Sequence, residues 1–168
     1  MNAVTLSALS DCYTIRRLSA ADLDMLYAFC KANAQYYAYC GREVTPADIL
    51  SDLTITPPGT SLDQKYYIGF FSGDTLTAIM DLIAGYPDST YAFIGFFMMN
   101  RDKQGHGAGS NLIQTALNAL KAQGFKRCKL AIHKENPQAT HFWQKNGFQI
   151  TREIPQEDGT LLVAEKAL

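Results

Sequence analysis

The sequence is poor in charged residues and has no excess of either sign. Only 18% of its 168 residues are charged, and 15 Lys and Arg are balanced by 16 Asp and Glu, for a formal net charge of -1. Nucleic-acid-binding domains usually carry a basic excess or stripe, because neutralising phosphates supplies most of their affinity. We therefore expect a protein that does not bind nucleic acid.

Long apolar runs and paired cysteines are also missing. No apolar stretch approaches the ~20 residues that cross a bilayer, and residues 1–17 have no basic segment ahead of their short apolar stretch, as a secretory signal would. The four cysteines form no C-x-x-C pair and match no histidine spacing of a metal site. These absences predict a soluble cytoplasmic protein without membrane contact, metal or disulfide framework, whose thiols are reduced and mostly buried.

The chain does hold enough apolar material for one core. Hydrophobic residues make up 47% of it, no internal repeat or low-complexity tract interrupts it, and its one linker-like stretch, residues 56–64, is typical of a loop within a domain. A chain of this length buries roughly 70% of its unfolded surface on folding, so it needs no cross-link. We expect a single domain over residues 1–168.

The spacing of apolar residues predicts a mixed α/β fold of the α+β class. Ser19 and Thr45 are typical helix N-caps, and Pro46 suits the first position of the second helix. Short turns between residues 66 and 99 predict an antiparallel meander, and the strand-helix-strand order that follows implies one parallel crossover. The expected helices are residues 19–33, 45–56, 107–123 and 137–145, and the expected strands are residues 12–18, 66–72, 75–84, 91–99, 128–132, 148–154 and 160–165. Together they predict a mostly antiparallel sheet of six to seven strands with about four helices on its faces.

A glycine-rich loop, QGHGAGS at residues 104–110, is the most informative segment. Glycines allow close backbone approach to a ligand, and the first amides of the following helix have no partner within it, so the loop predicts a phosphate or pyrophosphate site. A nucleotide P-loop would need Lys after the glycines, and a Rossmann fingerprint would need glycine at Ser110, so neither pattern fits. The remaining pattern, [QR]-x-x-G-x-[GA], is met by Gln104, Gly107 and Gly109, although such a short run also suits a simple turn.

A second motif begins at Asn136, in the segment NPQATHFWQKNGF. Asn136, Ala139, Phe142, Gly147 and Phe148 have the spacing N-x-x-A-x-x-F-[YF]-x-x-x-G-F. With the glycine loop before it, the segment from about residue 93 to 148 resembles the GNAT superfamily of N-acetyltransferases. The resemblance implies a GNAT-fold enzyme that moves an acetyl group from acetyl-CoA to a primary amine by direct attack in a ternary complex. A second hypothesis, of another class, is an acyl-CoA-binding regulatory or sensor domain without turnover.

The resemblance also implies where coenzyme A binds. Backbone amides of residues 104–110 would hold the pyrophosphate, and the strand before the loop would carry a bulge and pair with the pantetheine arm. The Phe97 amide would face the thioester oxygen, and the Asn136 side chain would meet the pantetheine amides from the other side. The implied coenzyme-binding residues are Phe97, Met98, Met99, Gln104, Gly105, His106, Gly107, Ala108, Gly109, Ser110, Asn136, Ala139, Phe142 and Trp143.

Two catalytic positions of the family differ in this chain. Phe93 stands where some members have a Glu base, and Trp143 stands where many have a Tyr that protonates the leaving thiolate; an indole cannot supply that proton at neutral pH. His133 or His141 could supply it, although a histidine at such a position is more often a surface or packing residue.

Asp81 is the candidate replacement for the missing base. It interrupts an apolar strand, AIMDLI, and the expected hairpin brings it roughly opposite residues 93–95. A carboxylate in such a strand is costly unless it has a partner. Asp81 therefore either faces a polar pocket as a general base or makes a structural hydrogen bond.

The acceptor pocket is expected between the first two helices, their loop and the turn before the fourth strand. Tyr36, Tyr37, Tyr39 and Tyr86 lie on these segments and could bind an amphipathic or cationic amine, or could simply pack the helices. The acceptor remains open among a polyamine, an amino acid, a peptide N-terminus, an aminoglycoside and a protein lysine. The sequence is equally consistent with a monomer and a homodimer.

Overall fold

The computed structural model describes residues 3–168 and places seven strands in one sheet. The strands are β1 (Thr14–Arg17), β2 (Lys65–Ser72), β3 (Thr75–Ala84), β4 (Tyr91–Met99), β5 (Arg127–His133), β6 (Gln149–Gln156) and β7 (Gly159–Ala167). The helices are α1 (Leu23–Ala32), α2 (Ala34–Tyr39), α3 (Pro46–Asp52), α4 (Ala108–Ala122) and α5 (Pro137–Lys145). Short 3-10 turns lie at η1 (Leu6–Leu9), η2 (Ala20–Asp22), η3 (Leu62–Gln64) and η4 (Arg101–Lys103).

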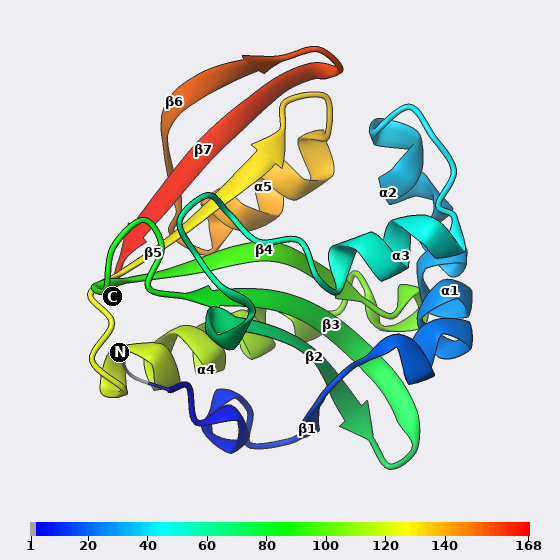
Figure 1. The fold of residues 1–168 in the computed structure, drawn as a ribbon, viewed down its shortest axis with the longest axis horizontal. Helices are drawn as coiled ribbons and strands as arrows, with labels where there is room; N and C mark the ends of the chain where they lie inside the picture. The colour runs from blue at the N-terminus through cyan, green and yellow to red at the C-terminus, as the bar shows by residue number, and fades with distance from the viewer. Residues whose placement is uncertain (1–2) are drawn as a thin grey trace.

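Strands β4 and β5 open the sheet into two parts. The strand order is β1-β2-β3-β4-β5-β7-β6, and β4 with β5 is the parallel pair in an otherwise antiparallel sheet. Their pairing runs only from Tyr91 opposite Arg127 to Ile94 opposite Leu130. Beyond it the strands diverge, and Figure 1 shows β5, β7 and β6 rising away from β4. From residue 95 onward, the edge of β4 therefore faces an opening instead of β5.

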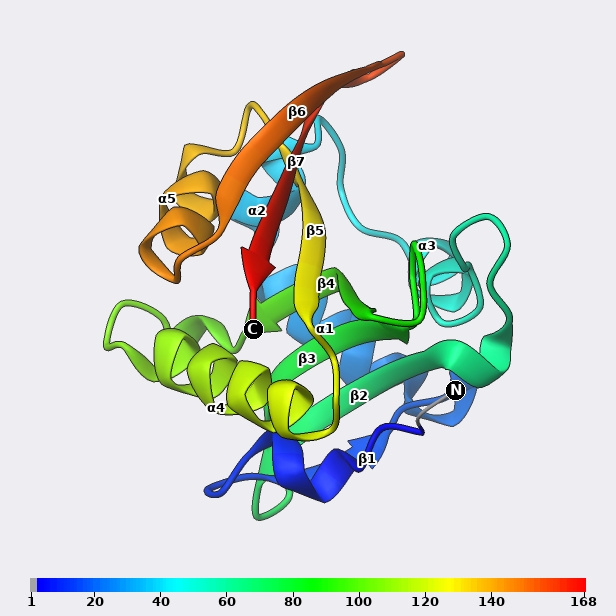
Figure 2. The same ribbon diagram turned by 90° about the vertical axis from the view of Figure 1, so that its left-hand side faces the viewer.

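Two apolar cores cover the two faces of the sheet. Figure 2 shows α4 and α5 on one side and α1 and α3 on the other. Buried side chains of α4, including Ile113 and Leu120, pack with Ile68, Met80 and other residues of the central strands. The opposite core joins α1 and α3 to the alternate residues of the same strands, and its members include Leu26, Ile49, Phe71, Ile79 and Met98. Burial on both faces explains the nearly continuous apolar sequences of β2 and β3.

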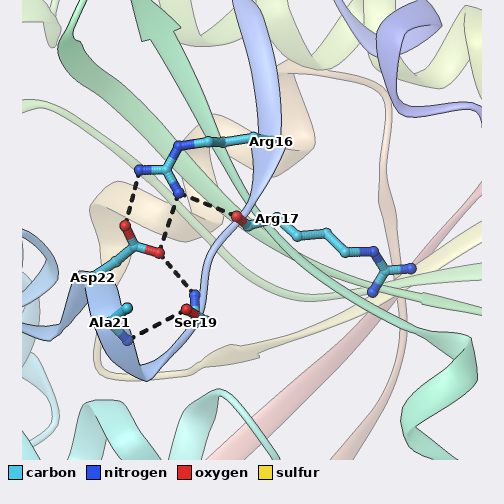
Figure 3. Close-up of polar contacts among 5 residues, drawn as sticks. All are labelled: Arg16, Arg17, Ser19, Ala21 and Asp22. Atoms are coloured by element: carbon cyan, nitrogen blue, oxygen red, sulfur yellow. Dashed lines mark hydrogen bonds and ion pairs between the residues drawn. The ribbon is translucent and has the colours of Figure 1, made fainter.

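A hydrogen-bonded cluster joins β1 to the start of α1 (Figure 3). Ser19 and Asp22 form a capping box, in which the Ser19 side chain accepts from Ala21 N and Asp22 accepts from Ser19 N. Arg16 donates to both carboxylate oxygens of Asp22, at 3.2 and 2.8 Å. The Arg17 guanidinium points away from this cluster (Figure 3) and donates to the carbonyl of Lys65 at 2.8 Å. Arg17 thus holds the backbone of Lys65, whose side chain reaches the site described below.

The structure confirms the predicted fold class and most of its elements. The meander at β2, β3 and β4 is within one residue of the expected ranges, and α5 has the expected bounds. The first strand is shorter than expected, and α2 was not expected as a helix because its run of tyrosines has no clear apolar face. All four cysteines are free, but only Cys30 and Cys128 are buried. None of the helices within residues 3–168 is long and apolar enough to cross a membrane.

Candidate active site

The opening between β4 and β5 contains a cavity of about 640 Å³, here called the large cavity. One wall is the edge of β4 from residue 95 to Met99, and the other consists of the end of β5 and the helix α5. Gly105, Gly107, Gly109 and Ser110 form one end of it. Two motifs that are separate in the sequence therefore line the same cavity.

The glycine loop gives this end of the large cavity an anion-binding geometry. Gly107 precedes α4 with φ +79°, a left-handed conformation that favours glycine. The first hydrogen bond of this helix runs from Asn111 N to Gly107 O, so the amides of residues 108–110 precede it and have no partner within the helix. These amides, with the dipole of a 15-residue helix, suit a phosphate group.

Basic residues that the sequence analysis did not select add positive charge to the large cavity. Arg101, in the 3-10 turn before the glycine loop, and Lys145, at the end of α5, both line it. Their closeness to the two motifs in the sequence was a signal that could have identified them.

The Gln104 side chain holds the glycine loop in place through two hydrogen bonds. Its Nε2 donates to the side-chain oxygen of Asn33 at 2.7 Å and to the carbonyl of Met99 at 3.0 Å. Asn33 is buried between α1 and α2, and its Nδ2 donates to the carbonyl of Phe29. The glycine loop is thereby tied both to the end of β4 and to the junction of the first two helices, a contact over 71 positions of sequence that no local pattern indicates.

The α5 wall is fixed by a cap and by aromatic packing. Asn136 is buried and its Oδ1 accepts from Ala139 N at 2.9 Å, so it caps the helix as well as lining the large cavity. Phe142 stacks on Phe97 of β4 with ring centroids 5.9 Å apart. Trp143 is 8% exposed and packs edge-on against Phe142 and Phe148. The indole is therefore part of an aromatic cluster, and Trp143 lines the large cavity together with Phe97 and Phe142.

A second cavity of about 400 Å³, here called the small cavity, lies where α2 and the loop after α3 face the sheet. Tyr36 and Tyr37 line it from α2, and Phe93 lines it from β4. Four residues line both cavities, and they are Tyr36, Gly95, Phe96 and His133. The two cavities therefore meet at the point where β4 and β5 begin to separate.

Asp81 lines the small cavity and is also held in a buried ion pair. Its Oδ2 lies 2.7 Å from Lys65 Nζ, while Oδ1 is buried without a hydrogen-bond partner among the described residues. Burial raises the pKa of the Asp81 carboxyl to about 6, although the Lys65 ammonium opposes this shift. A carboxyl with such a pKa can both accept and release a proton near neutrality. Asp81 can therefore face a cavity as a candidate base and make a structural hydrogen bond at the same time, so the two interpretations left open by the sequence are compatible.

A β-bulge adjusts the register beside Asp81. Asp81 pairs with Phe96 and Leu82 pairs with Ile94, so Gly95 is the extra residue of β4. Asp81 was expected opposite residues 93–95, but it lies opposite Phe96, one residue further along β4. A Cβ atom on Gly95 would lie 2.7 Å from Asp81 Oδ2, which is closer than real contacts allow. Glycine at this position makes room for the carboxylate.

The remaining selected residues differ in where they lie. His133 ends β5 and lines both cavities, whereas His141 is exposed and lines the large one. His106 and Ala108 belong to the glycine loop but lie outside the lining of both cavities. Of the four tyrosines, Tyr36 and Tyr37 line the small cavity; Tyr39 and Tyr86 line neither, and Tyr86 packs edge-on against Phe93.

Comparison with known proteins agrees with this geometry. Residues 26–148 match the acetyltransferase (GNAT) family. The chain belongs to this family. The match covers both cavity-lining motifs, the Gly95 bulge and the Asp81 strand of this GNAT protein. Among curated protein sequences, none matches it significantly.

Solved structures share the fold of this GNAT acetyltransferase at low sequence identity. An acetyltransferase from Thermus thermophilus is 24% identical with a TM-score of 0.71, covering 93% of this chain and 97% of its own. PaiA N-acetyltransferase from Thermoplasma acidophilum, in complex with coenzyme A, is 18% identical with a TM-score of 0.66, covering 93% and 99%. The aminoglycoside acetyltransferase AAC(6')-Ib, in complex with coenzyme A and kanamycin, is 15% identical with a TM-score of 0.69, covering 92% and 94%.

Proposed function

We propose that this GNAT protein is a single-domain N-acetyltransferase that moves the acetyl group of acetyl-CoA to a primary amine by direct attack. The observation that carries the proposal is the junction of the two cavities at Tyr36, Gly95, Phe96 and His133. A donor in the large cavity and an acceptor in the small one can be bound together, with their reactive ends at this junction. Such an arrangement supports transfer within a ternary complex.

The large cavity fits the chemistry of coenzyme A. Its pyrophosphate would bind the amides of residues 108–110, with Arg101 and Lys145 adding charge. From residue 95 onward, the edge of β4 that no longer pairs with β5 offers backbone groups to the amides of the pantetheine arm. Two solved structures with this fold, PaiA and AAC(6')-Ib, are complexes with coenzyme A, which supports the same assignment here.

Three groups of this chain are proposed to assist the transfer. An alkyl amine has a pKa of about 10, so it must lose a proton before it attacks, and Asp81 is the candidate acceptor of that proton. The amide of Phe97 is the candidate donor to the oxygen on which negative charge develops. His133, at the junction, is the candidate proton donor to the departing thiolate, a role that the indole of Trp143 cannot fill.

Thiol release from acetyl-CoA tests the proposal. The protein is incubated with acetyl-CoA and a panel of primary amines, while free thiol is followed and the acetylated amine is identified by mass spectrometry. We expect amine-dependent thiol release and a matching acetylated product. Coenzyme binding without release across a broad panel would favour the regulatory or sensor function instead. Failure to bind acetyl-CoA would contradict both.

A further inference from the structure

The charged side chains around the small cavity leave one carboxylate without a partner. Arg42, Asp52 and Asp81 line this cavity. Arg42 is engaged by Asp48 at 2.6 Å, and Asp81 is engaged by Lys65 at 2.7 Å. Each of the two cations here, Arg42 and Lys65, is thus already paired with a carboxylate. Within residues 3–168 the side chain of Asp52, the third carboxylate, makes no hydrogen bond or ion pair. The excess negative charge of the cavity lies on Asp52.

The position of Asp52 is unfavourable for an unpaired carboxylate, for two reasons. It is the last residue of α3, where the backbone carbonyls at the helix end also carry negative partial charge. Its side chain is partly withdrawn from water, and this desolvation raises the pKa of the carboxyl despite the nearby Arg42 and Lys65. A bound cation would relieve both effects, since a charge in a cavity of low polarity gains most from a direct partner.

The rest of the cavity suits the body of a small organic cation. Aromatic side chains line much of it, and they are Tyr36, Tyr37, Tyr67, Phe93 and Phe96. Aromatic faces attract ammonium groups and pack against methylene chains. A volume of about 400 Å³ lies within the range of small-molecule sites.

We propose that Asp52 binds a second, non-reacting ammonium group of the acceptor, so that this protein prefers small diamines to monoamines. This inference rests on the proposed function, because it places the reacting amine at the junction of the cavities and the second amine at Asp52. The aliphatic chain between the two amines lies along the aromatic wall. Asp81 remains with Lys65 and is not a partner for the second charge.

The test compares acceptors that differ only in the second amine. Diaminobutane and diaminopentane are assayed against butylamine and pentylamine, with kcat/KM corrected for the two equivalent amines of each diamine. A charge-assisted hydrogen bond corresponds to about a tenfold to hundredfold preference, so we expect the wild type to favour one of the diamines by that factor. In Asp52→Asn the preference should fall close to one, mainly through a higher KM for the diamine.

Two further variants separate the binding of the second ammonium group by Asp52 from general effects of removing a carboxylate. Asp52→Glu keeps the charge and should retain part of the preference. Asp74→Asn removes an exposed carboxylate in the turn between β2 and β3 and should keep the wild-type ratio. Wild-type protein without a preference for diamines, or an Asp52→Asn protein with an unchanged ratio and an unchanged melting temperature, would overturn the inference.

Failure of the proposed function gives a different result. If no amine releases thiol from acetyl-CoA, the proposed function fails. Calorimetric titration with diaminopentane then tests only whether Asp52 binds an ammonium group. Binding that is lost in Asp52→Asn and kept in Asp74→Asn would support it. Equal binding to all of these proteins, or no binding to the wild type, would refute it.

Discussion

The ammonium of Lys65 lies 2.7 Å from the carboxylate of Asp81, on the diagonally neighbouring position of the adjacent strand. The Lys65 side chain is 2% exposed and that of Asp81 is 12% exposed. Ion pairs this far from water are not in general a source of stability, because desolvation offsets much of the attraction. The Lys65 ammonium instead opposes the rise in the pKa of the Asp81 carboxyl that burial causes next to the β4 bulge.

Replacement of Asp81 by Asn tests its role as the base. The carboxylate accepts a proton only when it is ionised, so wild-type activity should fall as the pH drops through about 6. In Asp81→Asn we expect kcat/KM at neutral pH to be lower by about a hundredfold, a usual contribution of a general base, and the step near this pH to disappear. The measurement is kcat/KM across the pH range, together with the melting temperature. An unchanged profile in a stable variant would remove Asp81 from the mechanism.

Replacement of Lys65 by Met should make stability depend on pH. Without its cation, the Asp81 carboxyl should have a pKa even further above its unfolded value, so the folded state takes up a proton more readily than the unfolded state. The free energy of unfolding should therefore be reduced by about 3–5 kcal/mol well above this pKa, and by less as the pH falls through it. Urea unfolding at acidic and at alkaline pH measures the difference.

Lys121 offers a matched control for the loss of a lysine. It is exposed on α4, and Lys121→Met should change stability little at either pH. A loss in Lys65→Met that is the same at both pH values would argue against a buried, uncompensated Asp81.

Gly95→Ala should act through Asp81. The added Cβ would approach Asp81 Oδ2 to 2.7 Å, so the carboxylate has to move from its place beside Lys65. We expect a loss of activity comparable to that of Asp81→Asn. A double-mutant cycle decides the mechanism: if the glycine acts through the carboxylate, the double variant should be no less active than Asp81→Asn alone. Additive losses would indicate that Gly95 contributes independently.

Gly107→Ala and Gly59→Ala form a matched pair at the glycine loop. Both glycines have φ +79° and open space where a Cβ would be, so either substitution introduces backbone strain of about 1–2 kcal/mol without a clash. We expect similar losses of stability in both variants. Only Gly107→Ala should weaken the binding of coenzyme A, because Gly59 lies outside the large cavity. Calorimetry with coenzyme A measures this, and equal weakening in both variants would contradict the proposed pyrophosphate site.

The fold was predictable where local chemistry determines it. Thr45 and Pro46 start α3 as expected, and the Gly73-Asp74 turn fixes β2 against β3. The two motifs that line the large cavity were also evident in the sequence, because glycine spacing and helix caps are local patterns. The position of Asp81 could be placed only to within one residue, since an expected hairpin assumes regular pairing and the Gly95 bulge breaks it.

The sequence could not show how distant side chains meet around the two cavities. Lys65 reaches Asp81 across a hairpin, and Gln104 reaches Asn33 over 71 positions. In the sequence, nothing distinguishes Asp52 from other helix residues. In the fold, it lines the same cavity as Tyr36 and Arg42. Such contacts depend on tertiary packing, which no periodicity encodes.

The extra residue in β4 also inverts the alternation of the strand. Before Gly95, Ala92 and Ile94 face the core under α4; after it, Phe97 and Met99 do, although regular pleating would turn them to the other side. Phe96 and Met98 face the core under α1 instead. If Gly95 took part in regular pleating, Phe96 and Met98 would turn toward the core under α4, and Phe97 and Met99 would turn toward the core under α1. The bulge therefore decides which side chains at the end of β4 each core receives.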